Sequence, residues 1–402
     1  MRGPKIAAID VGTTKVCTIM AAMDGDSGLR VLGVGVAPSR GMEKALVANI
    51  NLTRESILES VRKAEKMAGY KLDSAYVGVT GRHINSMNNR GVIAITRTDQ
   101  LVRSADLRRV MDVALNIKAP SDRKLLHVIP RTYVLDGQEV KNPVGMHGYE
   151  LNVEAHVVTA SVASIQNLTK CIMRLGINIE DLILEPLASA EAVLAEEEKQ
   201  NGVLVADIGG GTTDIAVIKE GSIYHTSVLP VAGSQVTHDI SVGLGLSFEL
   251  AEEMKRKYAN VTPAIEETSD KDVSLSGDGH SVSSRDLCDI VYARMEELIR
   301  LIVLELPRTD YARVIPAGIV LTGGTSNLPG LAELASEITR LPVRIGMPAS
   351  LYGVSQEVLN DPAYATSVGL LLWKMKNEGA IKWPTQTSGL RRFFNQIFRL
   401  FQ

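Results

Sequence analysis

Short apolar segments alternate with amphipathic segments along most of the chain, and the two kinds repeat with different periods. Apolar runs of about four to eight residues predict β-strands, whereas apolar positions spaced three and four residues apart predict helices with one buried face. This alternation indicates an α/β fold. We expect strands near 74–79, 92–95, 156–160 and 318–322, and helices near 54–68 (after a capping Thr53), 164–175, 188–199, 247–258, 284–306 and 331–340.

Two segments half the chain apart carry nearly the same pattern. Residues 6–22 (IAAIDVGTTKVCTIMAA) and 204–221 (LVADIGGGTTDIAVIKEG) each consist of an apolar strand, a glycine-containing turn and a second apolar strand. Glycine at the turn predicts a β-hairpin in both places. Because Asp10 and Asp207 hold the same place in the two patterns, the simplest architecture is a pair of related lobes that face each other.

The composition is that of an ordinary globular protein, with 45% hydrophobic and 22% charged residues among 402. The formal net charge is −3, but residues 379–402 hold four basic and no acidic side chains, which leaves 39 basic and 46 acidic residues in the body. An acidic body argues against nucleic acid as a partner. Three scattered cysteines and seven scattered histidines favour neither disulfides nor a histidine metal centre. We expect no secretory leader and no membrane span, and therefore a cytoplasmic location or one on the cytoplasmic face of a membrane.

The two turns carry residues suited to binding phosphate. Glycine lets an anion approach backbone N–H groups, the threonine hydroxyls add donors, and Lys15 can offset phosphate charge. An aspartate beside such a turn can hold Mg²⁺ through water. A third glycine pair follows the strand at 318–322, where backbone can meet adenosine or phosphate. The predicted nucleotide-binding residues are Asp10, Gly12, Thr13, Thr14 and Lys15 in the first turn, Asp207, Gly209, Gly210, Gly211, Thr212, Thr213 and Asp214 in the second, and Gly323, Gly324 and Thr325 in the third, with Asp10 and Asp207 expected to hold Mg²⁺ through water.

Each turn taken alone could be an ordinary hairpin turn. Two matching turns and a third glycine element, in this order, favour a nucleotide site. Other glycine motifs do not compete, since the chain has no GxxxxGK[ST] and Gly33-Val-Gly35 lacks the third glycine of a dinucleotide motif.

The end of the chain concentrates aromatic and basic side chains. Four of the five phenylalanines lie in the last ten residues, and a helix with about 100° per residue places all the apolar residues of 390–402 in one arc of roughly 160°. Aromatic residues opposite arginines are typical of a helix that lies in a membrane interface. The alternative is a helix that docks on a partner or on the body of this protein. The linker at 379–389 disfavours docking on the body. The predicted membrane residues are Leu390, Phe393, Phe394, Ile397, Phe398 and Phe401.

The three glycine turns resemble the phosphate and adenosine motifs of the actin superfamily, and longer stretches resemble the FtsA family of bacterial cell-division proteins. The resemblance covers essentially the whole chain. It implies an actin-like two-lobed ATPase fold with an inserted small α/β subdomain and a C-terminal amphipathic helix. The stretches that carry it are residues 77–81 with His83, Ile84 and Ser86, then 126–130, 134–137, 142–146 and 361–370.

The resemblance also divides the chain into parts. The first lobe is expected to comprise 1–81, 164–199 and 345–378, and the second lobe to comprise a core (200–242 and 311–344) and a small subdomain (243–310). Residues 82–163 form the insert, for which strands near 92–95, 128–135 and 154–159 and a helix near 104–114 are expected. The hydrophobic pattern by itself supports a separate interaction module there.

Further site residues are implied by the resemblance. Glu252 and Lys255 would border the adenine and ribose, although an i,i+3 surface ion pair is an alternative. Gly233 belongs to a glycine turn near the same cleft. Glu185, before Pro186, would position the hydrolytic water or else be a solvated carboxylate at a helix start. The helix at 284–306 would bind the acidic C-terminal tail of the tubulin-like protein FtsZ through Arg285, Arg294 and Arg300, for which solvated arginines are the alternative.

The predicted function is that of an ATP-binding cell-division protein with at most slow ATP hydrolysis. Its expected role is to tether FtsZ filaments to the cytoplasmic membrane at the division site, to polymerise there as a peripheral protein, and to recruit later divisome proteins. The alternatives are an actin-like protein of pilus assembly and a small-molecule kinase of the same fold.

Overall fold

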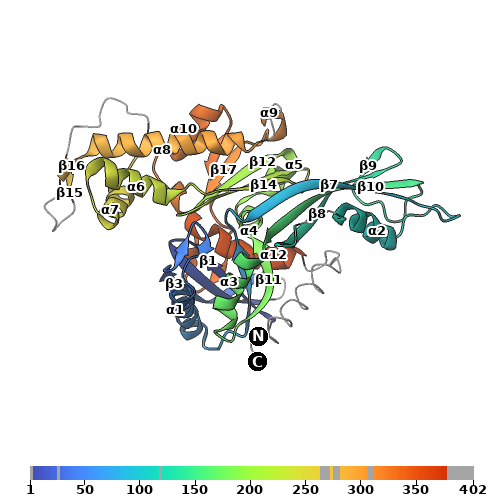
Figure 1. Ribbon diagram of the computed structural model, residues 1–402, viewed down its shortest axis with the longest axis horizontal. Helices are drawn as coiled ribbons and strands as arrows, with labels where there is room; N and C mark the ends of the chain where they lie inside the picture. Colours follow the sequence, from blue (N-terminus) through green and yellow to red (C-terminus); the bar gives the residue numbers. More distant parts are fainter. Residues whose placement is uncertain are drawn as a thin grey trace.

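The computed structural model of the protein describes residues 3–24, 28–116, 120–262, 272–274, 281–306 and 311–377. These residues form two lobes, each built on a β-sheet, and an arm that projects sideways from the region between the lobes (Figure 1). The predicted α/β fold class is confirmed. None of the helices within the described ranges is long and apolar enough to cross a bilayer. The predicted linker and terminal helix lie outside the described residues.

The first lobe contains a six-stranded sheet in the order β11-β6-β1-β2-β3-β19. The hairpin predicted at 6–22 is confirmed as the antiparallel pair β1–β2, in which Asp10 lies opposite Cys17. Helices α1 and α3 cover one face and enclose an apolar core with β1 and β6. The bounds are β1 Lys5–Val11, β2 Lys15–Met23, β3 Leu29–Pro38, β4 Met42–Glu43, β5 Leu46–Val47, α1 Ile50–Ala68, β6 Ser74–Val79, α3 Val162–Met173, β11 Asn178–Leu184, β19 Tyr352–Gly353 and α11 Gln356–Leu359.

The second lobe contains a five-stranded sheet in the order β14-β13-β12-β17-β18. The hairpin predicted at 204–221 is confirmed as β12–β13, and Asp207 pairs with Asp214 across it. The core lies between this sheet and helices α6, α7, α8 and α10. The bounds are β12 Val203–Ile208, β13 Thr213–Lys219, β14 Ser222–Leu229, α6 Gly233–Leu244, α7 Phe248–Tyr258, β15 Asp272–Ser274, β16 Ser281–Ser283, α8 Ser284–Leu304, α9 Tyr311–Val314, β17 Ile319–Thr322, η2 Gly324–Asn327, α10 Leu331–Thr339 and β18 Val343–Ile345.

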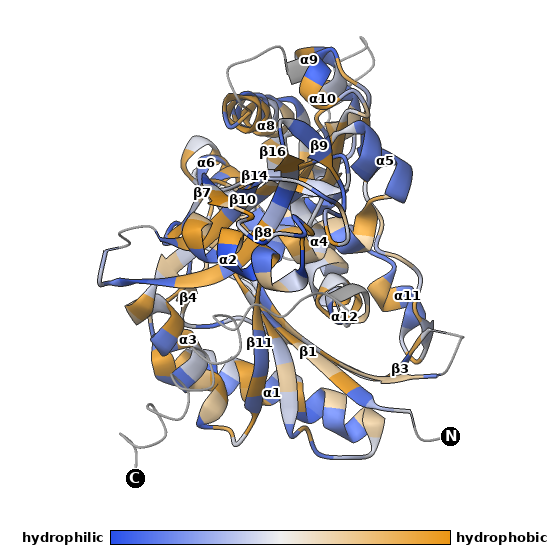
Figure 2. Ribbon diagram, turned by 90° about the vertical axis from the view of Figure 1, so that its right-hand side faces the viewer, coloured by the Kyte–Doolittle hydropathy of each residue, from blue (hydrophilic) through white to orange (hydrophobic). Residues whose placement is uncertain are grey.

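Two helices form an apolar layer that joins the lobes. α4 (Glu185–Val193) and α12 (Ala365–Asn377, after η3 Pro362–Tyr364) pack on each other, and one continuous core cluster contains residues of both sheets as well as of these helices. Nearly every residue of α4 is buried. The next helix, α5 (Glu196–Asn201, EEEKQN), is hydrophilic and blue along its length in Figure 2. The change in hydropathy follows the change from the interlobe layer to the surface.

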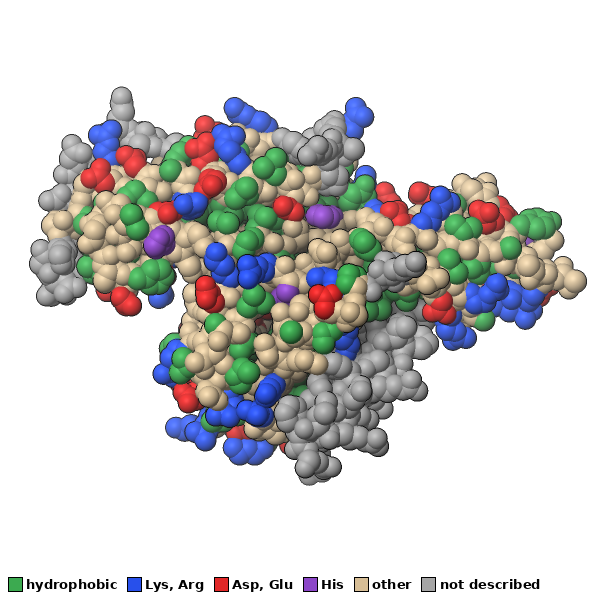
Figure 3. Space-filling view, in the orientation of Figure 1, with side chains coloured by type: hydrophobic (Ala, Val, Ile, Leu, Met, Phe, Trp, Pro, Cys, Tyr) green, Lys and Arg blue, Asp and Glu red, His purple; other side chains and the backbone are tan. Residues whose placement is uncertain are grey.

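The inserted segment forms the projecting arm, with a four-stranded sheet in the order β7-β10-β8-β9 and one helix, α2, over its core. In the space-filling view its acidic and basic side chains are intermixed (Figure 3). The sheet also contacts β14 of the second lobe. Ser86 Oγ donates to the Thr226 carbonyl at 2.7 Å, and His156 Nε2 lies 2.9 Å from Thr226 Oγ1. The bounds are β7 Ile84–Ala94, α2 Ser104–Leu115, β8 Arg123–Leu135, β9 Gln138–Val140 and β10 Glu150–Ser161.

The predicted helix at 54–68 begins earlier than expected. α1 starts at Ile50 because the Asn49 side chain caps it, accepting from the N–H groups of Asn51 and Leu52. Thr53, the predicted cap, is instead a buried residue of the first turn. The prediction that Thr53 caps this helix was therefore wrong. The sequence offers two candidate cap residues four positions apart, Asn49 and Thr53, and the helix uses Asn49.

The prediction of a single helix at 188–199 was also wrong, because two helices, α4 and α5, occupy this region. Pro186 lies in the first turn, so α4 begins at Glu185, and it ends before Leu194, whose backbone is extended. A new helix begins after Ala195, whose N–H donates to the Glu198 carboxylate at 2.8 Å. The buried layer ends where the run of glutamates begins, and the chain changes direction there.

Candidate functional site

The two matching turns have the same local geometry. In the first, the Gly12 N–H donates to the Lys15 carbonyl at 3.0 Å, and in the second the Gly209 N–H donates to the Thr212 carbonyl at 2.9 Å. Each bond closes the hairpin tip across its glycine-threonine segment. The glycines thus leave backbone N–H groups at the tip without a side chain in front of them.

The two tips lie directly against each other. A Cβ added to Gly210 would lie 2.3 Å from Thr14 Cγ2, and one added to Gly211 would lie 2.4 Å from Thr13 Oγ1. Both separations are far shorter than real Cβ contacts. Only glycine therefore fits where the second turn meets the first, and the structure brings together the sequence-predicted residues of both turns.

Aspartates behind the turns are buried and held by hydroxyl groups. Ser367 Oγ donates to Asp10 Oδ2 at 2.6 Å, while Asp207 Oδ2 accepts from Ser189 at 2.5 Å and from Thr366 at 2.8 Å. These hydroxyls come from α4 and α12, the helices between the lobes. They fix the two carboxylates at equivalent positions on either side of the turn contact.

Burial raises the pKa of Asp10 and of Asp207, and the charge of Asp207 adds to the effect at Asp10. Burial likewise raises the pKa of Asp214 to about 7. The Lys15 ammonium opposes the rise at both Asp10 and Asp207, so it lies within electrostatic reach of both. Desolvated carboxyl groups that repel one another favour a cation at this place.

Direct coordination of a metal by several side chains has no support in the described parts of the chain, where no three His, Cys, Asp or Glu side chains are placed to hold an ion. Asp10 and Asp207 already accept bonds from hydroxyls. The arrangement fits Mg²⁺ that keeps its water and bridges phosphates, because such a metal needs few direct protein ligands.

The third glycine turn packs against the second. Gly323 has φ of +87°, and a Cβ there would lie 2.3 Å from Asp207 Oδ1. Thr325 Oγ1 donates to the Gly209 carbonyl at 2.8 Å. A Cβ on Gly233 would lie 2.5 Å from Thr325 Oγ1. The second turn is therefore surrounded by Gly323, Thr325 and Gly233. Gly324 begins the short helix η2, which contains Thr325.

Lys255 and Glu252 form more than a surface ion pair. Lys255 Nζ is buried and donates to the Gly233 carbonyl at 3.0 Å and to Thr237 Oγ1 at 2.8 Å, and it lies 2.6 Å from Glu252 Oε2. Burial lowers the pKa of Lys255, while the charge of Glu252 opposes that change. The pair thus fixes the start of α6 beside the third turn, on the side where the adenosine was expected.

Glu185 is buried at the start of α4, so the alternative of a solvated carboxylate is wrong. Burial raises its pKa well above the usual value, and the charges of Asp10, Asp214 and Asp207 add to the rise. The carboxyl group therefore lies among the aspartates of the two turns. Its position is consistent with the expected role toward a water molecule.

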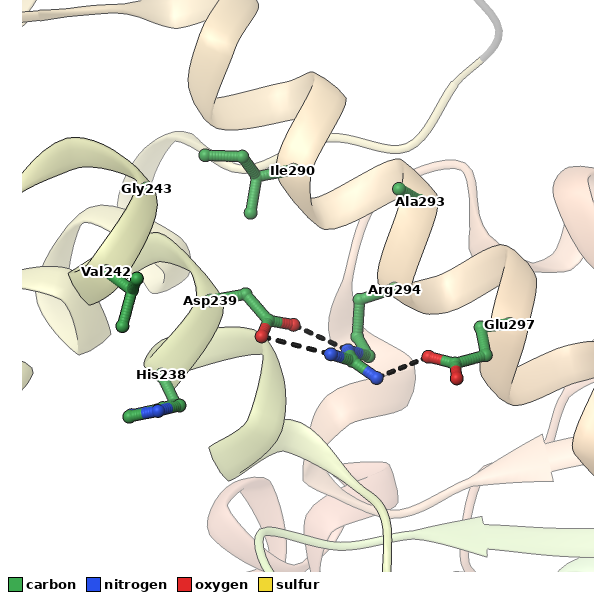
Figure 4. A pocket seen from close by; sticks show the side chains of 8 residues that line it. All are labelled: His238, Asp239, Val242, Gly243, Ile290, Ala293, Arg294 and Glu297. Atoms are coloured by element: carbon green, nitrogen blue, oxygen red, sulfur yellow. Dashed lines mark hydrogen bonds and ion pairs between the residues drawn. The ribbon is translucent and has the colours of Figure 1, made fainter.

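A pocket with a volume of about 510 Å³ lies between α6 and α8, away from the turns. Figure 4 shows the Arg294 guanidinium between Asp239 and Glu297, with Ile290 on the neighbouring turn of α8. Arg294 Nη2 donates to Asp239 Oδ1 at 3.0 Å. Of the three predicted peptide-binding arginines, Arg294 lines this pocket, whereas Arg285 is exposed elsewhere on α8 and Arg300 pairs with Glu296 at 2.7 Å.

Sequence reasoning missed the hydroxyl residues that hold the aspartates. Thr366 and Ser367 lie in a stretch that carried the family resemblance, but a hydroxyl beside an apolar helix gives no sign of its partner. Thr80 likewise lies in a stretch that carried the resemblance, without any sign of its partner, and Ser189 gave no local signal. The repeated Asp-x-Gly turns could have prompted a search for donors in segments that follow buried strands, as Thr80 follows β6.

Two family models match the chain. The model described as cell division protein FtsA matches residues 204–369, and the one described as the SHS2 domain inserted in FtsA matches residues 81–159. The chain is 44% identical over 380 residues to cell division protein FtsA of Pseudomonas aeruginosa, covering 94% of this chain and 90% of that protein. It is 33% identical over 378 residues to cell division protein FtsA of Escherichia coli K12, covering 91% and 89%.

Solved structures with the same fold are much less similar in sequence. The PilM-PilN type IV pilus biogenesis complex matches with a TM-score of 0.66 at 17% identity, covering 92% of this chain and 98% of that chain. MreB5 of Spiroplasma citri bound to ADP matches with a TM-score of 0.56 at 14% identity, covering 94% and 98%. These similarities establish an actin-like fold.

Proposed function

The chain belongs to the FtsA family of cell division proteins, and on that premise we propose that it binds Mg²⁺-ATP between its lobes and attaches FtsZ filaments to the cytoplasmic membrane at the division site. The observation that carries the nucleotide part is the contact of Gly210 and Gly211 with Thr14 and Thr13. Two phosphate-type turns that meet at one place are explained by a single ligand that both of them hold.

Residues of both lobes would take part in nucleotide binding. The N–H groups of the two turns and the Thr13 and Thr14 hydroxyls face the phosphates, and Lys15 offsets their charge. Gly233, Gly324, Glu252 and Lys255 border the adenosine. Asp10 and Asp207 would hold Mg²⁺ through water, and the ion would neutralise phosphate charge. Glu185 positions a water for hydrolysis, which is slow at most.

The pocket between α6 and α8 is the proposed binding site for the FtsZ C-terminal tail. Arg294 is the arginine of the pocket and pairs there with Asp239 and Glu297, while Ile290 and Val242 provide apolar surface. Arg285 and Arg300 lie on the same helix, which also carries four acidic side chains. An acidic peptide would bind by taking the place of Asp239 or Glu297 on Arg294, with its apolar side chains against Ile290 and Val242.

Membrane attachment is assigned to the segment at 390–402. Each buried phenylalanine or leucine would contribute about 1.5–3 kcal/mol, against an ordering cost of about 1–2 kcal/mol per residue. A single segment should therefore bind weakly and reversibly. Self-association into filaments would join many weak segments into firm attachment by avidity, and the same filaments would recruit later divisome proteins.

Reconstitution on vesicles tests this function. The full chain with Mg²⁺-ATP should recruit FtsZ filaments to vesicles that contain anionic lipid, whereas a chain that lacks residues 390–402 should bind ATP but leave FtsZ in solution. Phe394→Glu with Phe401→Glu should act like the deletion, and Asn395→Glu with Gln396→Glu, on the polar side of the same segment, is the matched control for added charge. Equal FtsZ recruitment by the truncated chain would assign the segment to partner docking instead.

Neither alternative function gains support. The similarity to PilM, at 17% identity, shows the fold alone. The residues that surround the turns are explained by nucleotide and metal. Family membership favours cell division over both.

A further inference from the structure

A small enclosed cavity lies beside the first turn, between the first lobe and the start of the insert. Its volume is about 10 Å³, which is about the smallest space that holds one water molecule. Most of its wall is apolar and comes from β1, the segment at 42–47, β6 and α3. The titratable side chains that line it are His83 and Glu185, and Thr80 adds a hydroxyl.

His83 has two ring nitrogens that are shut off from solvent and have no hydrogen-bond partner within the described part of the chain. Burial and the nearby charge of Arg123 lower its pKa to about 4, so the ring is neutral at pH 7, with one donor and one acceptor. Buried polar groups without a partner are rare in native proteins. An unassigned hydrogen-bond partner therefore belongs in this cavity.

The chain holds the His83 ring in place from two sides. Gly81 has φ of +121°, and a Cβ there would lie 3.1 Å from His83 Nδ1, so glycine makes room for the ring. Arg123 Nη2, from β8 of the insert, donates to the His83 carbonyl at 3.0 Å. The ring is thus fixed at the point where the first lobe passes into the insert.

Glu185 reaches the same cavity from the other side. A Cβ on Gly78 would lie 3.1 Å from Glu185 Cγ and Oε1, so this glycine of β6 leaves space for the carboxyl group. Thr80, two residues further on, donates to Asp214 Oδ1 of the second turn. The cavity therefore adjoins the residues that we assign to phosphate and hydrolysis.

We propose that His83 is a positioning residue for Glu185 and acts through one water molecule bound in this cavity. The ring and the carboxyl group each use the water as a hydrogen-bond partner, which fixes the orientation of the carboxyl group. The role rests on the proposed ATP function. In hydrolysis the oxygen of a second water bonds to the γ-phosphorus while the bond from that phosphorus to the ADP oxygen breaks, and a proton of this water passes to an oxygen of the released phosphate. Glu185 sets where the second water lies.

The test compares two variants at one position. His83→Gln keeps a donor and an acceptor in the cavity, whereas His83→Leu keeps the bulk and removes both. His225→Leu is the control, since His225 is a half-buried histidine of β14 outside the cavity. Crystal structures of the full chain, solved with and without a non-hydrolysable ATP analogue, would locate the water. Steady-state ATP hydrolysis and titration with a fluorescent ATP analogue would supply kcat and affinity.

The wild type should show a water within hydrogen-bond distance of a His83 ring nitrogen and of a Glu185 oxygen. His83→Leu should lose that water and lower kcat by about ten- to a hundredfold with ATP affinity unchanged within about twofold. His83→Gln should restore most of kcat, and His225→Leu should match the wild type.

Several results would overturn the proposal. They are a cavity without the water, equal kcat in the Leu and Gln variants, a wild type that binds ATP without hydrolysing it, or a loss of ATP affinity in His83→Leu that accounts for its lower activity. A wild type that fails to bind ATP would instead overturn the proposed function, and the positioning role with it. A missing water in a protein that binds ATP would overturn the proposed role of His83 and leave the proposed ATP function standing.

Discussion

Thr80 Oγ1 donates a hydrogen bond to Asp214 Oδ1, and this bond joins two segments that lie 134 residues apart. Thr80 follows β6 of the first lobe, and Asp214 belongs to the second turn in the second lobe. Thr212 Oγ1 donates to the other oxygen of the same carboxyl group at 3.0 Å. One buried aspartate thus receives a hydroxyl from each lobe, so the relative position of the lobes is coupled to the second turn.

Replacing Thr80 should weaken both the fold and ATP binding. Thr80→Val keeps the shape but leaves one oxygen of Asp214 without its donor, which should cost about 1–3 kcal/mol of unfolding free energy. ATP affinity should fall, because the second turn loses its tie to the first lobe. Urea denaturation and titration with a fluorescent ATP analogue would measure the two effects.

A matched control for Thr80 is Thr226→Val. Thr226 is also buried, but its hydroxyl joins β14 of the second lobe to His156 of the insert, away from the turns. This variant should lose stability with ATP affinity unchanged. Equal loss of affinity in the two variants would mean that general destabilisation, and not the Thr80–Asp214 bond, controls ATP binding.

Gly210 and Gly324 should respond very differently to the same substitution. A Cβ on Gly210 would lie 2.3 Å from Thr14 Cγ2, whereas a Cβ on Gly324 would meet only Ala363 Cβ, at 3.6 Å. Gly210→Ala should therefore separate the two turns and lower ATP affinity by at least about tenfold (~1.4 kcal/mol). Gly324→Ala should lower ATP affinity less than Gly210→Ala, because its Cβ leaves the turn contact intact and can meet only the adenosine that Gly324 is proposed to border. Similar affinities for both variants would show that the turn contact does not form the site.

In the nucleotide-free protein, the buried carboxyl groups of the two turns should stabilise the fold less as the pH rises from about 4 to about 7. The Asp214 carboxyl group gives up its proton near pH 3.8 when unfolded but has a pKa of about 7 when folded, so unfolding releases a proton between these values. The raised pKa values of Asp10, Asp207 and Glu185 act in the same direction. The lowered pKa values of His83, His127 and His156 act in the opposite direction, so the carboxyl contribution is separated from the total by comparing variants in urea at pH 5 and pH 8.

Asp214→Asn isolates the Asp214 part of this effect, because an amide does not titrate. The unfolding free energy at pH 5 minus that at pH 8 should be more positive in the wild type than in the variant. An equal difference in the two proteins would mean that the pKa of Asp214 is not raised by folding.

Two arginines of α8 should separate peptide binding from stability. Arg300 contacts Glu296 one turn away on the same helix, so Arg300→Glu should leave the melting temperature nearly unchanged and weaken binding of an FtsZ tail peptide by about fivefold (~1 kcal/mol). Arg294 joins α8 to Asp239 of α6, so Arg294→Glu should lower both affinity and melting temperature. Calorimetry at low and high salt would show weaker peptide binding at high salt. Unchanged peptide affinity in Arg300→Glu at low salt would remove this residue from the binding surface.

Much of the fold follows from local signals in the sequence. The two hairpins, the helix at 284–306 and the strand before Gly323 depend on periodicity, turn glycines and caps within a few residues of each other. The repeated Asp-x-Gly-Thr-Thr pattern likewise identified the two turns that the structure brings together. Helix ends were less predictable, because Asn49 and Thr53 are both residue types that cap helices, and the packing of Thr53 in the core excludes it.

The sequence by itself determined which residues form the turns, since a glycine hairpin is specified by its own backbone. The tertiary structure alone decided which buried groups bond to one another. Ser367 donates to Asp10, Thr80 donates to Asp214, and Ser86 of the insert donates to the Thr226 carbonyl. Such contacts join residues more than a hundred positions apart, and a hydroxyl in an apolar segment has the same local pattern whatever it bonds. The partner is chosen by how α4 and α12 pack between the two sheets, and no local pattern encodes that packing.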